Sequence, residues 1–254
     1  MIEFFESELL HRAQFHVHGF TKRTGGVSKS PYDSLNLSYD VGDDPKDVAE
    51  NLKRLKSALN IDEPLVRVKQ VHGNRIVGSN ELTPSSWIDP PTVEADGIIS
   101  ADTQAVLAVQ NADCAPVLLA DPNKRIVAAI HAGWRGAANG VVRNGVRAMI
   151  DAGGDPSVII AVIGPCICLG CYEVDEDVAH HFPESCDPVK GKPGKFQLDL
   201  GLAVEVSLIG AGLTSKNIER IDACPSCMEK ELFSHRGSGG STGRILGFIK
   251  ADTA

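Results

Sequence analysis

Residues 105–136 read AVLAVQNADCAPVLLADPNKRIVAAIHAGWRG and contain three apolar runs separated by two turn signals. The runs AVLAVQ, APVLLA and RIVAAIH predict three strands, with turns at residues 111–113 and 121–123. Because apolar runs without polar alternation are typical of strands buried on both faces, we place this segment in the middle of a sheet. Cys114 opens the second strand and His131 closes the third. Both reactive side chains therefore lie at strand ends, where a sheet can present a functional site.

The overall composition is that of an ordinary folded protein. The chain has 254 residues, of which 43% are hydrophobic and 23% are charged. This length fits one large domain or two small ones, and no long polar linker marks a boundary. The net charge of -8 argues against a general nucleic-acid binder, which needs a basic face, although a small anion pocket stays possible.

The sequence also limits where the protein is expected to work. It has no apolar run long enough to span a bilayer, and its first residues, MIEFFESELLHR, are acidic and unlike a signal peptide. We therefore expect a cytoplasmic protein with no membrane partner. Seven cysteines, an odd number without a secretory context, favour reduced thiols or metal ligands over a disulfide framework.

Periodicity predicts the other elements of an α/β chain. Apolar residues at three- and four-residue spacing predict a helix over residues 45–59, with Asp44 as its cap and Pro45 in its first turn. Further helices are expected over residues 136–152, 175–182 and 200–211. Strands are expected over residues 13–20, 65–71 and 158–163.

Two interpretations of Cys114 are open at the level of residue types. His72 directly follows the strand expected over residues 65–71 and is therefore a third reactive side chain at a strand end. In the first interpretation, Cys114 is a nucleophile activated by His72 or by His131. Alternatively, all three side chains can bind one metal ion. A Cys/His/His set leaves one tetrahedral position open for water or substrate, as catalytic zinc sites do.

The remaining cysteines form a second candidate group. Cys166, Cys168 and Cys171, together with Cys224 and Cys227, could close a zinc or iron–sulfur site, and the last two could form a redox pair. The spacing of the first three is irregular, and no thioredoxin-like pattern surrounds the last two. We therefore interpret these cysteines as plain buried thiols.

The motifs Gln70-Val71-His72-Gly73, Ala112-Asp113-Cys114 and His131-Ala132-Gly133-Trp134-Arg135-Gly136 resemble the three signatures of the YfiH family. Its members have been called laccase-domain proteins or polyphenol oxidases and, later, purine nucleoside phosphorylases. Shorter motifs agree in order from Arg23 to Arg244, so the resemblance covers essentially the whole chain, residues 1–254, as a single domain. The family differs from this chain at residues 166–170, and Cys224-Pro-Ser-Cys227 is also unusual.

The resemblance implies a layered α/β sandwich with mixed β-sheets flanked by helices. It also implies a zinc ion bound by His72, Cys114 and His131, and no second metal cluster. The implied activities are phosphorolysis of adenosine, inosine, guanosine and S-methyl-5'-thioadenosine, and deamination of adenosine. The expected partners are therefore a purine nucleoside and phosphate.

The substrate contacts are hypotheses from position. Arg23, with the backbone amides of the following Gly-Gly pair, is a candidate phosphate clamp. Asn36 and Gln70 are candidates for hydrogen bonds to base or ribose, and Arg135 follows His131 closely enough to reach the site. Arg244 and Arg236 could serve the same anion pocket.

Two other classes of function stay open. A copper-dependent polyphenol oxidase would follow from the older family name, but multicopper oxidases need many histidine ligands and this chain has eight scattered ones. A non-catalytic protein that binds metal and nucleoside is the second. The sequence leaves the oligomeric state open.

Overall fold

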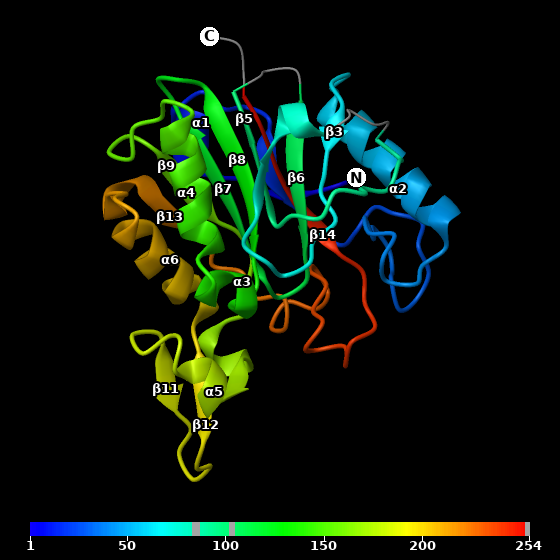
Figure 1. Cartoon of the computed structure of the whole chain (residues 1–254). Coiled ribbons are helices and arrows are strands. Elements are labelled where there is room, and N and C mark those ends of the chain that lie inside the picture. The colour runs from blue at the N-terminus through cyan, green and yellow to red at the C-terminus, as the bar shows by residue number, and fades with distance from the viewer. Residues whose placement is uncertain (83–86, 102–104, 252–254) are drawn as a thin grey trace.

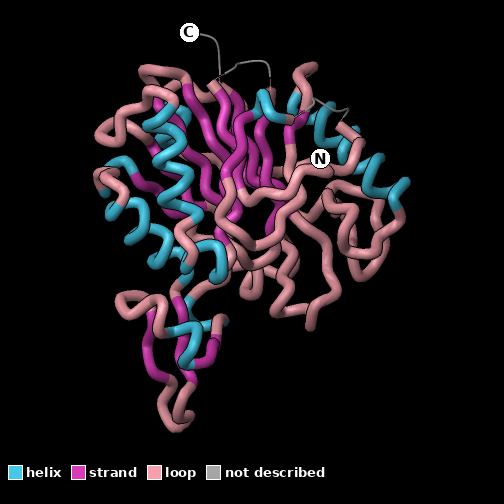
Figure 2. Tube along the Cα trace, viewed as in Figure 1, coloured by secondary structure: helices cyan, strands magenta, loops and turns pink. Residues whose placement is uncertain are grey.

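Two β-sheets stacked face to face form the centre of the computed structural model, which describes residues 1–82, 87–101 and 105–251. Helices cover the outer faces of the two sheets, and a small lobe projects from one end of the molecule (Figure 1). Figure 2 shows that long loops gather at the same end of the sheets as the lobe. The predicted α/β sandwich of mixed sheets flanked by helices is confirmed.

The larger sheet has six strands and contains the second and third apolar runs. Its order is β13-β9-β7-β8-β5-β4, with parallel pairing at both edges and antiparallel pairing between. The strands are β13 (Ile218–Arg220), β9 (Ile160–Ile163), β7 (Ala115–Asp121), β8 (Ile126–Ala132), β5 (Gly97–Ser100) and β4 (Ile76–Gly78). Every residue of β7 and β8 is buried, as their continuous apolar sequence predicts.

The second sheet has five strands in the order β1-β2-β14-β6-β3. They are β1 (Phe4–Phe5), β2 (His18–Thr21), β14 (Ile245–Lys250), β6 (Val106–Asn111) and β3 (Leu65–Val66). The first apolar run therefore lies in a different sheet from the other two, and our prediction of one shared sheet is wrong. The chain crosses between sheets in the short turn before Cys114, where Asp113 has a left-handed φ of 86°.

Side chains of the two sheets interdigitate in an apolar layer between them. A second and a third apolar layer lie on the outer faces, between each sheet and the helices that cover it. Leu118 and Ala120 of β7 pack between the sheets, whereas Val117 and Leu119 face helices α4 (Val141–Asp151) and α6 (Leu200–Gly210). On the opposite side, helix α2 (Pro45–Leu59) packs on the five-stranded sheet. The result is a four-layer arrangement of helix, sheet, sheet and helix.

The predicted helices are confirmed to different degrees. Helix α2 has the predicted bounds, and the Asp44 carboxylate accepts the backbone N–H of Lys46, a cap worth about 0.5–2 kcal/mol. The helix expected over residues 136–152 is instead two helices, α3 (Trp134–Ala138) and α4, because Gly140 adopts a left-handed φ of 82° between them. The strand expected over residues 65–71 ends at Val66.

The small lobe is an insertion between the larger sheet and α6. It contains a three-stranded sheet in the order β10-β12-β11 and helix α5 (Glu176–Ala179), which packs on it. The strands are β10 (Glu173–Asp175), β11 (Cys186–Pro188) and β12 (Lys195–Leu198). A backbone bond from Leu198 to the carbonyl of Tyr172, 3.0 Å long, closes the lobe at its base. Its root therefore lies beside Tyr172.

His18 is a buried histidine whose bonds require the neutral ring. Its Nε2 accepts the backbone N–H of Ser7 at 2.9 Å, and its Nδ1 lies 2.7 Å from the carbonyl oxygen of Phe15. Burial lowers the pKa of His18, with His11 lowering it further and Glu6 acting in the opposite direction. The neutral form with the proton on Nδ1 satisfies both neighbours.

We expect acidification to destabilise the fold through His18. Because its pKa is lower when folded, the unfolded chain binds the additional proton as pH falls below about 6.5, and stability is lost until the folded pKa is passed. The free energy of unfolding, measured by urea denaturation at about pH 7.5 and about pH 5.5, should fall more in the wild type than in His18→Gln. The exposed His16→Gln is the control, and equal losses in wild type and His18→Gln would contradict the assignment.

Candidate functional site

His72, Cys114 and His131 meet at one end of the two sheets. Cys114 directly precedes β7, His131 is the penultimate residue of the neighbouring β8, and His72 lies in a left-handed turn with φ of 58°. One ligand atom from each lies within 4.8 Å of the others. The rings of His72 and His131 are 4.8 Å apart between centroids and nearly perpendicular. The sulfur and the two imidazoles therefore converge on one point.

Asp96, which directly precedes β5, holds two of these ligands in place. Its carboxylate is fully buried and lies 2.9 Å from Nδ1 of His131. It also accepts the backbone N–H groups of His72 at 2.9 Å and Gly73 at 2.6 Å. With Nδ1 engaged, Nε2 of His131 is the nitrogen left to face the other ligands, as in the carboxylate–histidine arrangement of metal sites.

The protonation states of Cys114 and His131 depend on each other. Burial disfavours the Cys114 thiolate, but the charge and hydrogen bond of His131, with His72, outweigh it and lower the pKa of Cys114 to about 6. Burial likewise disfavours a charged His131, yet the thiolate and the Asp96 carboxylate raise the pKa of His131 to about 9. These opposite shifts show that the pocket favours a thiolate with a cation beside it.

The donor set suits a metal ion. One thiolate sulfur and two imidazole nitrogens are ligands that zinc prefers, and three protein ligands leave a fourth position open. A carboxylate that orients one histidine is the expected outer partner. On these grounds His72, Cys114 and His131 fit a bound metal ion.

Two cavities meet at this set. The first, of about 260 Å³, is lined by polar side chains that include Asp40, Gln70, Gln110 and Arg244. The second, of about 230 Å³, is lined among others by Trp134, Arg135, Tyr172 and Arg236. The residues common to both cavities are His72, Ala112, Cys114 and His235. The proposed ligands thus stand between a neutral polar cavity and a cationic aromatic one.

Comparison with known families decides the relationship of the chain. The family model described as "Multi-copper polyphenol oxidoreductase laccase" matches residues 17–252. The chain belongs to this family. It is the YfiH family that the sequence motifs indicate.

Individual members of the YfiH family are similar along nearly the whole chain. A purine nucleoside phosphorylase of Deinococcus radiodurans is 38% identical over 235 residues, covering 91% of this chain and 88% of the relative. The purine nucleoside phosphorylase YlmD of Geobacillus stearothermophilus is 36% identical over 248 residues, covering 92% and 89%.

Solved structures agree with the fold. The crystal structure of Geobacillus stearothermophilus YlmD has a TM-score of 0.86 at 35% identity, covering 93% of this chain and 92% of that one. A hypothetical YfiH protein of Bacillus licheniformis has a TM-score of 0.85 at 33% identity, covering 92% of each chain. Among the described residues of this YfiH-family chain, no helix is both long and apolar enough to cross a membrane.

Two of the four expected substrate contacts of this YfiH-family protein lie in the cavities. Gln70 lines the first, where its side-chain amide bonds the backbone of Gln110 in both directions at 2.7 Å. Arg135 lines the second and stacks on Trp134, with 4.4 Å from its guanidinium carbon to the ring centroid. Arg236 also lines this cavity, and its guanidinium lies over the Tyr172 ring and donates to the carbonyl of Glu173 at 3.2 Å.

Arg23 and Asn36 are engaged by the protein itself. The Arg23 guanidinium donates to the carbonyls of Asp33 and Glu229, and Arg23 lines neither cavity. Asn36 is fully buried and accepts the backbone N–H of Arg244 at 2.9 Å, which places it behind a cavity residue.

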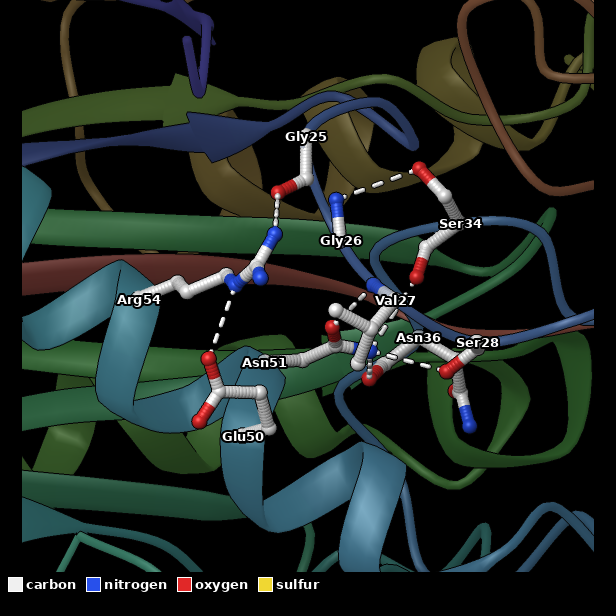
Figure 3. Close-up of polar contacts among 9 residues, drawn as sticks. All are labelled: Gly25, Gly26, Val27, Ser28, Ser34, Asn36, Glu50, Asn51 and Arg54. Atoms are coloured by element: carbon white, nitrogen blue, oxygen red, sulfur yellow. Dashed lines mark hydrogen bonds and ion pairs between the residues drawn. The ribbon is translucent and has the colours of Figure 1, made fainter.

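The Gly-Gly turn after Arg23 is likewise closed by internal bonds (Figure 3). The N–H of Gly26 donates to Ser34 Oγ at 3.1 Å, and the N–H of Val27 donates to the Asn51 side chain at 2.8 Å. Arg54 donates to the carbonyl of Gly25. Asn51, buried on α2, thereby fixes this loop to the helix, and the N–H groups of Gly26 and Val27 are both used within the protein.

Our interpretation of the other cysteines as plain buried thiols is wrong for four of them. Four of them, Cys168, Cys171, Cys224 and Cys227, bring their sulfurs within 4.8 Å of one another. Cys227 is exposed and only Cys224 is buried, so they do not simply fill a core. Cys166 is only partly exposed and is not in the group.

Residue types alone missed several parts of the site. Asp96 gave only the weak signal of an acid before a buried strand. Tyr172 and His235 lay within family-like motifs without an assigned role, although both line the second cavity. Burial raises the pKa of Tyr172 to about 12, so its hydroxyl is a neutral donor at pH 7.

Asp96→Asn should weaken metal binding. The amide NH2 would face either a histidine N–H or the backbone N–H groups that the carboxylate now accepts, so the ligands lose their orientation. We expect zinc affinity, measured by competition with a chromophoric chelator, to fall about 10- to 100-fold. The exposed Asp62→Asn is the control, and an affinity equal to wild type would refute the role of Asp96.

Gly133→Ala should crowd the same site from the opposite side. A Cβ at this position would stand 2.9 Å from Cys114 Sγ and 3.0 Å from His72 Cδ2, although the backbone φ of -74° suits alanine. Zinc affinity should fall at least about tenfold, while the melting temperature changes little. Gly210→Ala, whose Cβ meets nothing within 4 Å, is the matched control. Unchanged zinc affinity in Gly133→Ala would exclude this packing constraint.

Proposed function

We propose that this YfiH-family protein is a zinc-dependent purine nucleoside phosphorylase. Its substrates would be adenosine, inosine, guanosine and S-methyl-5'-thioadenosine, with deamination of adenosine as a second activity. Similar proteins named purine nucleoside phosphorylase support the reaction class. The observation that carries the proposal is the meeting of two chemically different cavities at His72, Cys114 and His131.

The first cavity suits the nucleoside. Gln110 and Asp40 supply amide and carboxylate groups that can pair with the edge of a purine or with ribose hydroxyls. The Gln70 amide, which bonds the Gln110 backbone, has one N–H and one acceptor position left for the same purpose. Asp40 and Arg244 balance each other in formal charge, so the cavity is close to neutral. A neutral nucleoside fits such a lining better than an anion does.

The second cavity suits phosphate. Arg135 and Arg236 outnumber the one carboxylate, Asp113, and that carboxylate already accepts Ser234 Oγ at 2.8 Å and the backbone N–H of Arg236 at 2.6 Å. Guanidinium groups bind phosphate through paired, charge-assisted hydrogen bonds. The neutral Tyr172 hydroxyl can add a donor. We assign the phosphate clamp to this cavity in preference to Arg23.

The ligand set stands where the two substrates would meet. His72, Cys114 and His131 would hold the zinc ion, which when bound supplies a Lewis acid that withdraws electron density from a group placed against it. Asp96 fixes the orientation of His131, and the cavity walls align phosphate with C1' of the ribose. Copper is the alternative metal for the same donors.

The reaction can then be written in terms of the bound groups. A phosphate oxygen forms a bond to C1', and the bond from C1' to the purine breaks with its electron pair going to the base. Arg135 and Arg236 hold the phosphate against the positive charge that builds on the sugar. His235, which lines both cavities, is our candidate to give a proton to the departing base.

The family description favours a different class, a multi-copper oxidase. Such an enzyme needs many histidine ligands and a separate electron-accepting copper site. Within the part of the chain that the structure describes, the two groups able to hold metal contain only two histidines, His72 and His131. We therefore keep oxidation of phenols as the alternative to be tested, beside a non-catalytic metal- and nucleoside-binding role.

We further propose that residues 1–254 act as one domain in the cytoplasm, where the thiols stay reduced. Nucleoside and phosphate, and no nucleic acid, would be its partners. The acidic balance of the chain, with a net charge of -8, supports a small-molecule substrate held by local cations.

Product analysis tests the function directly. Purified, metal-assayed protein is incubated with adenosine with and without phosphate, and products are separated by chromatography and identified by mass. Adenine and ribose-1-phosphate should form only with phosphate, and any inosine would report the deaminase. Arg236→Ala should raise KM for phosphate about 10- to 100-fold, with little effect on KM for adenosine.

Controls separate the alternatives. Arg147→Ala, an exposed residue of α4, should leave both KM values unchanged. Cys114→Ala should abolish turnover while circular dichroism stays native, and retained turnover would contradict the assigned site. Inosine alone would make the protein a deaminase. Copper in the protein with oxidation of phenols, and no cleavage of nucleosides, would overturn the proposal.

A further inference from the structure

Four cysteines converge at the base of the small lobe, outside the set formed by His72, Cys114 and His131. The sulfurs of Cys168, Cys171, Cys224 and Cys227 all lie within 4.8 Å of one another. Cys227 Sγ is 3.8 Å from Cys168 Sγ and 3.4 Å from Cys171 Sγ. Four sulfurs around one zinc ion, each about 2.3 Å from it, stand about 3.8 Å apart. The spacing therefore matches a tetrahedral zinc site.

The cluster consists of two pairs of cysteines, and a backbone hydrogen bond closes the turn within each pair. Cys168 and Cys171 lie at the two ends of a tight turn in which the N–H of Cys171 donates to the carbonyl of Cys168 at 3.0 Å. Cys224 and Cys227 form the same turn, with the equivalent bond at 3.1 Å. Both pairs are C-x-x-C, the spacing of zinc knuckles. Two separate segments thus present matching halves of one site.

A bond between the halves orients a sulfur for metal binding. The backbone N–H of Cys168 donates to Cys224 Sγ at 3.3 Å, across the gap between the two turns. N–H groups directed at sulfur stabilise a metal-bound thiolate. Four soft sulfur ligands and no oxygen or nitrogen form a closed set, which is typical of structural zinc sites and leaves no position for substrate.

The cluster joins two loops that both reach the second cavity. The first loop continues from Cys171 directly into Tyr172, and the second continues from Cys227 to His235 and Arg236. The far end of the second loop is held by Asp113, which bonds Ser234 and the backbone of Arg236. Cys224 and Cys227 hold the other end of this loop, where it begins.

We propose that Cys168, Cys171, Cys224 and Cys227 hold a structural zinc ion that fastens together two loops that form part of the wall of the second cavity. The site itself is independent of the proposed function, and only its effect on phosphate binding rests on it. The ion would be distinct from the one held by His72, Cys114 and His131.

Metal counting tests the site without any assay of activity. The full chain, produced with zinc, is analysed by mass spectrometry for metal per chain. We expect about two zinc ions in the wild type, about one in Cys171→Ser/Cys227→Ser, about one in Cys114→Ala and none in the combined variant. Cys186→Ser, a partly exposed cysteine of β11 outside the cluster, is the matched control and should keep both ions.

A measurement on the wild type avoids any dependence on how the variants fold. Cys227 is exposed, so alkylation mapped by peptide mass should be slow with zinc present and rise at least about tenfold once a chelator has removed it. Cobalt loaded in place of zinc should give strong sulfur-to-metal absorption in Cys114→Ala, where only the four-cysteine cluster remains.

The outcomes are decisive for this site. Unchanged zinc content in the cysteine double variant, iron with the absorption of an iron–sulfur centre, or a Cys171–Cys227 disulfide in protein kept under reducing conditions would each overturn it. Failure of the phosphorylase assay would leave the metal count unaffected, so the two proposals fail separately.

Hydrogen exchange tests the link to the cavity. In Cys171→Ser/Cys227→Ser, amides of the loop from Cys224 to Arg236 should lose protection, and KM for phosphate should rise about tenfold or more with a smaller change in KM for adenosine. Loss of protection confined to the four cysteines, with KM for phosphate unchanged, would contradict a role in fastening the wall.

Discussion

The arrangement of the site depends on one buried carboxylate. Asp96 has no exposed surface, and its oxygens are surrounded by N–H groups from the His131 ring and from the backbone of residues 71–73. A buried carboxylate is tolerated only when its hydrogen bonds are complete. Moving any of these N–H donors away from Asp96 would leave its charge without a partner, so the donors are fixed in position. The end of β8, the start of β5 and the turn of His72 consequently form one rigid unit. These hydrogen bonds therefore fix the positions of His72 and His131 relative to each other.

The two-sheet fold explains why Cys114 lies beside His72 and His131. The chain leaves β6 in one sheet and enters β7 in the other, and Cys114 lies at the crossing. Asp113, in the left-handed conformation beside it, uses its carboxylate to anchor the loop of Ser234. One short turn therefore positions Cys114 on one side and the loop of Ser234, which continues into a cavity wall, on the other.

The sequence predicts the local parts of this structure better than the distant ones. Helix α2 has its predicted bounds because its cap at Asp44 and its apolar periodicity are encoded within a few residues. The sheet assignment of residues 105–110 was wrong because strand pairing depends on partners far along the chain, here β14 and β3. Residue types grouped His72 and His131 with Cys114, but they left a nucleophile and a metal ligand equally open. Only the family resemblance favoured the metal ligand. Asp96 was missed because its partners lie 23 to 35 residues away. The four cysteines were considered together, but plain buried thiols were preferred because the two C-x-x-C halves meet only in the fold.

The projecting lobe has a consequence for how this scaffold can be altered. Its two ends come together beside Tyr172, while residues 190–194 at the tip of the β11–β12 hairpin are exposed and include two glycines with positive φ. A chain that leaves and re-enters the body at one point can be lengthened at its tip without displacing what lies at its root. The hairpin is thus a natural attachment position for a fluorophore or a fused domain, because its tip lies away from the two cavities while its root lies beside Tyr172, which lines the second of them.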